Sequence, residues 1–254
     1  MGIDEAINAT MTWGTQFVTW HFFAALYNIL DETGRKGTAP GCWVWKYKLR
    51  KKDNVTYEQI LPRVLFNQVF ILLPVMTTMA YFGYGSTNTP MALWKWPVYA
   101  YVLGVFHDVV FYFGHRLLHT KWGYVTFRHG LHHSSKAATA ASSMYMSSPD
   151  FFLEIVLPYL SFFWVVPTSL AFDMTVASVG SIAAMTEHSG YNFSVGFKTL
   201  DSRPHFAHHN NLLTGAYAEG IFSPGYMDRI FGTNYVDPEA LGVVEGSPKC
   251  ASKE

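Results

Sequence analysis

Long apolar runs with few or no charged side chains are the feature of this sequence that most restricts its fold. Residues 64–84 (VLFNQVFILLPVMTTMAYFGY) contain no charged side chain, and about 20 apolar residues are enough for a helix to cross roughly 30 Å of hydrocarbon. Residues 93–114 form a second run, in which Trp94 and Trp96 are placed like interfacial anchors. Both runs predict helices that span a membrane.

Three further apolar segments extend this helical framework. Residues 11–30 are long enough to cross a bilayer, but they contain the polar residues Gln16, His21 and Asn28, so a helix there can also lie in the interface. Residues 151–167 and 172–186 are separated only by TSLA, which predicts a helical hairpin that turns at residues 167–171.

The charge pattern indicates how these segments are oriented. Charged residues make up 14% of the 254 residues, against about 25% in ordinary soluble domains. Residues 31–63 carry eight Lys or Arg against four Asp or Glu, so we expect this loop to be cytoplasmic by the positive-inside tendency. Two crossings then return the chain to the same side at His115. A net charge of zero gives no sign of a nucleic-acid partner.

The same pattern suggests a division of the chain into three parts. We expect residues 1–63 to form an N-terminal membrane-associated helix and a basic cytoplasmic loop. Residues 64–235 would form one membrane-embedded domain that carries the chemistry, and residues 236–254 a polar C-terminal tail.

Nine of the eleven histidines fall into four short groups, HRLLH, HGLHH, EHSGYN and HFAHHN. Their histidines are His115, His119, His129, His132, His133, His188, His205, His208 and His209. Spacings of three and four place side chains on one face of a helix. Because one metal ion normally takes four to six ligands, nine histidines predict a dinuclear site on the cytoplasmic side.

The helix that leads into HRLLH also carries polar residues on one face. Asp108, Tyr112, His115 and His119 follow each other at spacings of four, three and four. A metal-bound histidine usually donates its second ring N–H to a carboxylate or carbonyl. We therefore expect Asp108, with Tyr112, to support a ligand histidine of this or a neighbouring helix through its second ring nitrogen. The isolated His21 and His107 are interpreted as hydrogen-bonded structural residues.

Several familiar motifs are absent from the sequence. It contains no HExxH, which disfavours a zinc peptidase with a glutamate base in its motif. It contains no GxGxxG or GxxxxGK[ST], and no CxxCH for haem attachment. Electrons for redox chemistry would therefore have to come from another protein.

In its four histidine groups, the chain resembles the fatty acid hydroxylase superfamily of integral membrane di-iron oxygenases. This superfamily includes sterol desaturases, sterol 4-methyl oxidases, sterol side-chain hydroxylases and sphingolipid fatty acid 2-hydroxylases. The resemblance covers about residues 108–235 and includes FHDVVFYFGHRLLH, HSGYNF and the closing GYMDRIFGTNY. There is one departure: Ser194 and Val195 stand where the sterol 4-methyl oxidases and side-chain hydroxylases commonly continue with Pro-Trp.

This resemblance implies an all-α fold, an integral membrane helical bundle with a cytoplasmic helical cap that holds a histidine-rich dinuclear metal site. The nine histidines would be the ligands of two Fe ions, with Zn possible in purified material, and Asn192 would be a further ligand. The reaction would use dioxygen and electrons from NAD(P)H, delivered by a cytochrome b-type protein or a reductase. The location would be the endoplasmic reticulum, with the metal site facing the cytoplasm.

The expected function is a lipid hydroxylase or oxidase acting at the membrane face. A sterol is the first choice of substrate because of HSGYNF, and a fatty acyl or sphingolipid chain is the second. Desaturation stays open, because it begins with the same hydrogen abstraction. A membrane Zn or Cu transporter and a non-catalytic scaffold are the alternatives from other classes. A transporter should place its ligands along a path through the bilayer.

Overall fold

The computed structural model describes residues 2–163, 165–194, 200–210 and 213–235. Within those ranges the chain is helical and contains no strand, which confirms the expected all-α class. The longer helices are α1 (Ile3–Arg35), α3 (Tyr57–Asn67), α4 (Leu73–Tyr81), α5 (Trp96–Leu118), α8 (Leu157–Phe163), α9 (Leu170–His188) and α10 (Arg203–Asn210). The shorter ones are α2 (Gly41–Val44), η1 (Trp45–Tyr47), η2 (Gln68–Leu72), η3 (Leu93–Lys95), α6 (Lys121–Thr126), η4 (His129–Ser134), η5 (Ala140–Met144), α7 (Ser148–Phe151), η6 (Phe152–Val156) and α11 (Tyr226–Phe231).

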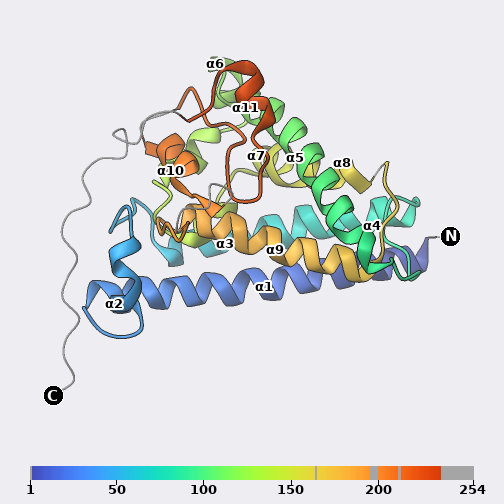
Figure 1. Ribbon diagram of the computed structural model, residues 1–254, viewed down its shortest axis with the longest axis horizontal. Coiled ribbons are helices and arrows are strands. Elements are labelled where there is room, and N and C mark those ends of the chain that lie inside the picture. Colours follow the sequence, from blue (N-terminus) through green and yellow to red (C-terminus); the bar gives the residue numbers. More distant parts are fainter. Residues whose placement is uncertain (1, 164, 195–199, 211–212, 236–254) are drawn as a thin grey trace.

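Helix α1 lies along the bundle and packs against α9 and α4 (Figure 1). It begins at Ile3, well before the predicted residue 11. Asp4 and Glu5 lie in its first turn and complement the helix dipole. Its buried face mixes core side chains such as Trp20 with paired polar ones: Gln16 Nε2 donates to Ser181 Oγ of α9 at 3.2 Å. Its outer face carries exposed apolar side chains such as Val18 and Phe22.

The outer face of α1 differs from that of a soluble helix because it is mostly apolar, and several polar groups of the helix face inward. Polar side chains within a bilayer are expected to face the bundle interior and to pair with one another. His21, interpreted as a structural residue, does so: its Nε2 lies 3.0 Å from Gln68 Oε1. Two of the three polar residues that made the segment 11–30 ambiguous as a span, Gln16 and His21, thus have partners on neighbouring helices.

A single continuous helix contains α3, η2 and α4 and runs from Tyr57 to Tyr81. It starts seven residues before the predicted residue 64 because Thr56 and Gln59 form a capping box at its N-terminus. Its central turn is a π-helix. Pro74 lies just after that turn and lacks the amide that would donate to Phe70, four residues earlier, which accounts for the local widening.

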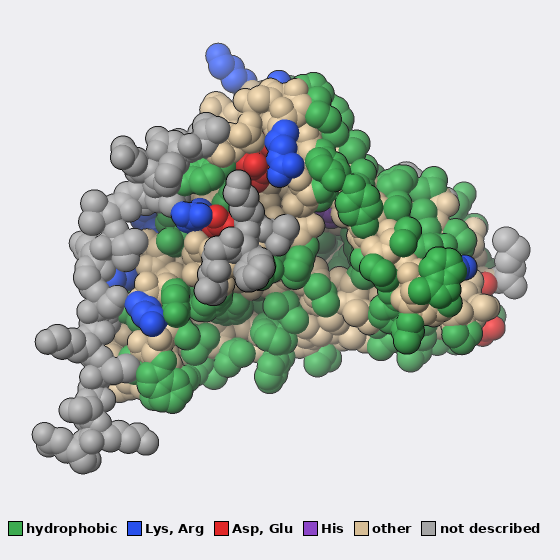
Figure 2. Space-filling model, in the orientation of Figure 1, with side chains coloured by type: hydrophobic (Ala, Val, Ile, Leu, Met, Phe, Trp, Pro, Cys, Tyr) green, Lys and Arg blue, Asp and Glu red, His purple; other side chains and the backbone are tan. Residues whose placement is uncertain are grey.

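In the part of the chain that the structure describes, two helices are long and apolar enough to cross a membrane, judged by length and composition: Tyr57–Tyr81 and Leu93–Leu118. They correspond to the predicted spans at residues 64–84 and 93–114. The segment 11–30 and the predicted hairpin do not meet the same criteria within the described residues. Figure 2 shows hydrophobic side chains spread over the outer surface of the bundle.

The predicted hairpin is present as two helical arms. The first arm contains α7, η6 and α8, and the second is α9. Ser169 caps α9 by accepting a hydrogen bond from the Phe172 amide. The C-terminal parts of α5 and α9 and the short helices η4 and α10 meet at one end of the bundle, away from the N-terminus (Figure 1). The division of the chain at residues 63/64 stays a prediction, and the predicted tail 236–254 lies outside the described residues.

Candidate metal centre

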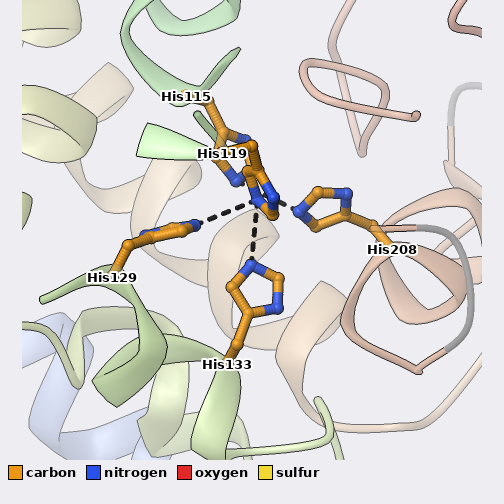
Figure 3. Close-up of side chains that lie close together, drawn as sticks. All are labelled: His115, His119, His129, His133 and His208. Atoms are coloured by element: carbon orange, nitrogen blue, oxygen red, sulfur yellow. Dashed lines mark hydrogen bonds between the residues drawn. The ribbon is translucent and has the colours of Figure 1, made fainter. Parts of the chain in front are cut away.

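The nine histidines that were predicted as metal ligands come together in two adjacent groups. The first histidine group contains His115, His119, His129, His133 and His208 (Figure 3). The second histidine group contains His132, His188, His205 and His209. Within each group the candidate ligand nitrogens all lie within 4.8 Å of one another. The two groups touch, because the His133 and His209 rings stack with their centroids 4.5 Å apart.

Both HxxHH boxes contribute to both groups. On η4, His132 belongs to the second group while its neighbour His133 belongs to the first. On α10, His205, His208 and His209 share one face at spacings of three and four, yet His205 and His209 enter the second group and His208 enters the first. These two helices therefore lie between the groups and hold them together.

Backbone carbonyls determine which ring nitrogen faces inward. Nδ1 of His115 lies 2.6 Å from the Tyr217 carbonyl, and Nδ1 of His208 lies 2.7 Å from the Gly215 carbonyl. A carbonyl only accepts, so each Nδ1 must carry the proton and donate. The inward Nε2 of both rings then carries a lone pair. In the second group His188 donates from Nδ1 to the Ala184 carbonyl at 2.8 Å in the same way.

These facing lone pairs make the site suited to a cation. Nε2 of His208 and Nε2 of His115 lie 3.1 Å apart, yet neither has a proton to share with the other. Two ligands at right angles on an ion with bonds of about 2.1 Å lie about 3.0 Å apart. In addition, Nε2 of His209 is buried and has no hydrogen-bond partner. The donor set, its spacing and this orphaned nitrogen all fit transition-metal ions.

Burial favours the neutral form of several of these rings. It lowers the pKa of His188 to about 4 and the pKa of His119 to about 2, and it lowers the pKa values of His132, His205 and His209 well below their usual value. Repulsion between a protonated ring and neighbouring protonated histidines lowers these pKa values further. His188 is the exception, because no neighbouring histidine lowers its pKa. Neutral imidazoles are the form that binds metal.

Acidification from pH 7 to pH 5 is expected to destabilise the metal-free protein. A histidine whose pKa falls from 6.5 to about 4 on folding, as for His188, takes up a proton only when unfolded between those values. The unfolded state then binds more protons, so the free energy of unfolding drops as the pH falls through 6.5. Thermal unfolding in detergent at several pH values above 5 measures this. His209→Gln should give a shallower dependence, and a midpoint that rises on acidification would contradict the argument.

An aspartate of the closing DRIFGTNY segment supports the first group from a distance. Asp228 is fully buried, and its carboxylate accepts hydrogen bonds from the backbone amides of Tyr217, Ala218 and Glu219 at 2.6–3.0 Å. This contact holds the loop whose Tyr217 carbonyl receives the His115 proton. The role of Asp228 is thus to position a histidine rather than to contact metal.

A second aspartate supports the second group in the same manner. Asp53 accepts hydrogen bonds from the Ser135 hydroxyl at 2.7 Å and from the amides of Lys136 and Ala138 at 2.8 and 3.0 Å. The Ser135 carbonyl in turn accepts the Nδ1 proton of His209 at 3.1 Å. Asp53 therefore orders the segment that follows HGLHH and, through it, one ring of the second group.

Asp108 occupies a different place from the expected one. Its carboxylate accepts hydrogen bonds from the Ser223 hydroxyl at 3.1 Å and from the Met227 amide at 3.0 Å, so it ties α11 to α5. A distance of seven residues along a helix, about 10.5 Å, keeps it from the His115 ring of its own helix. Tyr112 reaches His115 indirectly: its ring packs edge-on against Tyr217, whose ring contacts His115.

Asn192 lies in neither histidine group. Its side-chain carbonyl accepts a hydrogen bond from the backbone amide of Ser194 at 3.2 Å, and its backbone amide donates to the Tyr47 carbonyl at 2.9 Å. Its role as a metal ligand stays a prediction. His107, interpreted as structural, stacks on Phe111 of its own helix and also stands outside both groups.

Sequence reasoning missed two buried carboxylates of the first hairpin arm. Asp150 Oδ1 accepts the Nδ1 proton of His129 at 3.0 Å, and this is the contact that was expected of Asp108. Glu154 lies between the groups and forms a third candidate ligand set with His129 and Asp150. An available signal was the presence of Glu154 in the apolar run 151–167, because an ionisable residue at membrane depth is a functional-site hypothesis by default.

Comparison with known proteins gives a family model and several relatives that match the chain. The family model described as fatty acid hydroxylase matches residues 100–233. The chain is 32% identical over 222 residues to a very-long-chain aldehyde decarbonylase, GL1-11, of Oryza sativa subsp. indica, which covers 79% of each chain. It is 30% identical over 207 residues to methylsterol monooxygenase 2-2 of Arabidopsis thaliana, covering 74% of each. Methylsterol monooxygenase 1 of Rattus norvegicus is 30% identical, over 74% of this chain and 67% of its own. No solved structure matches the chain.

Proposed function

The chain belongs to the fatty acid hydroxylase family, and on that premise we propose that it is a membrane-bound, dioxygen-dependent lipid hydroxylase or oxidase. The observation that carries the proposal is the convergence of nine buried histidines into two touching groups of five and four. Each group offers about the number of imidazoles that one ion takes. We assign the first histidine group to one iron ion and the second histidine group to another.

The chain's own residues orient these ligands and keep water away. The carbonyls of Tyr217, Gly215 and Ala184 hold Nδ1 protons of three rings, so that the opposite nitrogens stay free to bind. Burial of nearly all the ligand rings excludes bulk water, which limits side reactions of a reactive oxidant. When bound, a pair of ferrous ions supplies the activation of dioxygen for attack on an unactivated C–H bond.

A sterol is the first choice of substrate. Two of the relatives are methylsterol monooxygenases by name, and HSGYNF is typical of the sterol 4-methyl oxidase and side-chain hydroxylase branches. A fatty acyl or sphingolipid chain is the second choice, and desaturation by the same site remains an alternative reaction. The outward-facing apolar side chains of the bundle support delivery of such a lipid from the bilayer.

Removal of the carbonyl carbon from a long-chain aldehyde is a second candidate reaction. The relative from Oryza sativa subsp. indica, at 32% identity over 79% of the chain, favours it. Transport of Zn or Cu is disfavoured, because the histidines gather in two touching groups rather than along a path through the bundle. We expect electrons from NAD(P)H to arrive through a cytochrome b-type protein or a reductase, and we expect the endoplasmic reticulum as location with the metal site facing the cytoplasm.

Lipid analysis of cells with and without the protein tests the proposed function. The expected result is a lipid that gains one oxygen atom when the protein is present and that disappears in His132→Ala, because one ion loses a ligand. His21→Ala is the matched control, since that ring lies outside both groups and contacts Gln68.

Each other outcome identifies a competitor. A lipid that loses two hydrogens indicates desaturation, and conversion of a long-chain aldehyde to a hydrocarbon one carbon shorter indicates decarbonylation. Altered zinc or copper uptake with an unchanged lipid profile would contradict the oxygenase assignment.

A further inference from the structure

Glu154 is a buried carboxylate that faces both histidine groups. Its side chain is 1% exposed. Oε1 lies 3.3 Å from Nε2 of His115 in the first group, and Oε2 lies 3.9 Å from Nε2 of His132 in the second. Oε1 also lies 3.6 Å from Nδ1 of His129. One oxygen is thus directed at each group.

The nearest of these contacts is not a hydrogen bond. The His115 ring donates its proton from Nδ1 to the Tyr217 carbonyl, so its Nε2 presents a lone pair to Glu154, whose ionised carboxylate has no proton to donate. Oε1 is accordingly a buried oxygen without a hydrogen-bond partner. Leaving such an atom unpaired costs about 1–3 kcal/mol, and more for a charged group. A cation between the two atoms would satisfy the oxygen and the nitrogen together.

The helix around Glu154 is adapted to direct this side chain inward. Glu154 is the central residue of the π-helical turn η6 (Phe152–Val156). Pro158 follows four residues later, so it has no amide to donate to the Glu154 carbonyl and its ring would clash there in a regular α-helix. Single π turns inside helices occur frequently at functional sites.

Asp150, the other carboxylate of this arm, already has a partner. Its oxygens lie 3.0 and 3.2 Å from Nδ1 of His129, so it orients that ring and fixes its proton. Glu154 has no equivalent hydrogen bond through Oε1. The two acidic residues therefore differ in role: Asp150 accepts the Nδ1 proton of His129, whereas Glu154 lies between the two histidine groups.

We infer that Glu154 is a metal ligand that bridges the two ions through its two carboxylate oxygens. The inference rests on the proposed dinuclear site and adds an oxygen ligand to an otherwise all-nitrogen set. Paired ions that share a site lie roughly 3.5–4 Å apart, a separation that one carboxylate can span. Its negative charge would also offset part of the charge that two divalent ions bring into a buried site lined by neutral imidazoles.

The test uses the full-length protein in detergent, loaded with cobalt(II) as the probe. A bridging carboxylate couples the two ions magnetically, so the unmodified protein should bind two cobalt ions and show exchange coupling in magnetic susceptibility and electron paramagnetic resonance. Glu154→Gln, which keeps the size of the side chain, should lose the coupling and bind the second cobalt ion at least about 10–100-fold more weakly, since even residues that only support a ligand have effects of that size.

Asp173→Asn is the matched control, because Asp173 is also a buried carboxylate but lies outside all three candidate metal groups. It should retain both ions and their coupling. Unchanged affinity and coupling in Glu154→Gln would overturn the inference, and so would the absence of coupling in an unmodified protein that holds two ions. The latter measurement needs no variant. An unmodified protein that binds no cobalt would instead contradict the proposed dinuclear site itself.

Discussion

Replacing His208 with alanine is expected to reduce the bound metal from two ions to one and to lower lipid oxidation by more than about 100-fold. His208 belongs to the first histidine group, and its Nε2 lies 3.1 Å from that of His115. Removing it leaves its ion with fewer ligands and an open, water-accessible position. Substitution of a residue that only hydrogen-bonds to a metal ligand already costs about 10–100-fold in metal affinity or activity. Loss of the ligand itself should cost more.

The neighbouring residue gives the complementary experiment. His209→Ala removes a ligand of the second group from the same helix, α10. Each single variant should retain one ion by mass spectrometry of the purified protein, and the double variant should retain neither. Arg203→Ala is the control on the same helix, because that side chain pairs with Asp201. Two ions in either single histidine variant would contradict the ligand assignment of that residue.

Replacing Lys48 with methionine is expected to lower the free energy of unfolding by about 3–5 kcal/mol, the usual effect of breaking a buried ion pair from one side. Lys48 is 1% exposed, and its Nζ lies 2.5 Å from Asp31 Oδ1. It also donates to the carbonyls of Ala138 at 3.0 Å and Ser189 at 2.6 Å. The substitution would leave a carboxylate and two carbonyls buried without this donor.

The same change should also weaken metal binding, because Ser189 directly follows the ligand His188. Denaturant unfolding in detergent and metal titration measure the two effects. Lys46→Met is the matched control, since Lys46 is exposed in the same basic loop, and it should change stability by less than about 0.5 kcal/mol. Asp31→Leu combined with Lys48→Met should recover part of the loss, because no buried charge is then left unpaired. A loss in Lys48→Met no larger than in the control would contradict this role.

Two buried residues show where prediction from local sequence failed. Lys48 was counted with the other basic residues of a cytoplasmic loop, yet it is the donor that joins the end of α1 to the segments after HGLHH and His188. Asp108 shares a helix face with His115 by spacing, but its carboxylate turns to Ser223 and Met227. In both cases the partner lies far away in the sequence, so periodicity carries no information about it.

The amino-acid order was sufficient to predict the helical class, the two candidate spans and the nine histidines that converge, because hydropathy, helical periodicity and ligand chemistry depend on residue type and short spacings. It was not sufficient to assign adjacent histidines to their groups: His132 and His133 separate only because η4 lies between two faces of the site. Nor did it identify Asp150 and Glu154. The packing of the first hairpin arm against α5 brings these carboxylates to the histidines, and such long-range contacts depend on the whole fold.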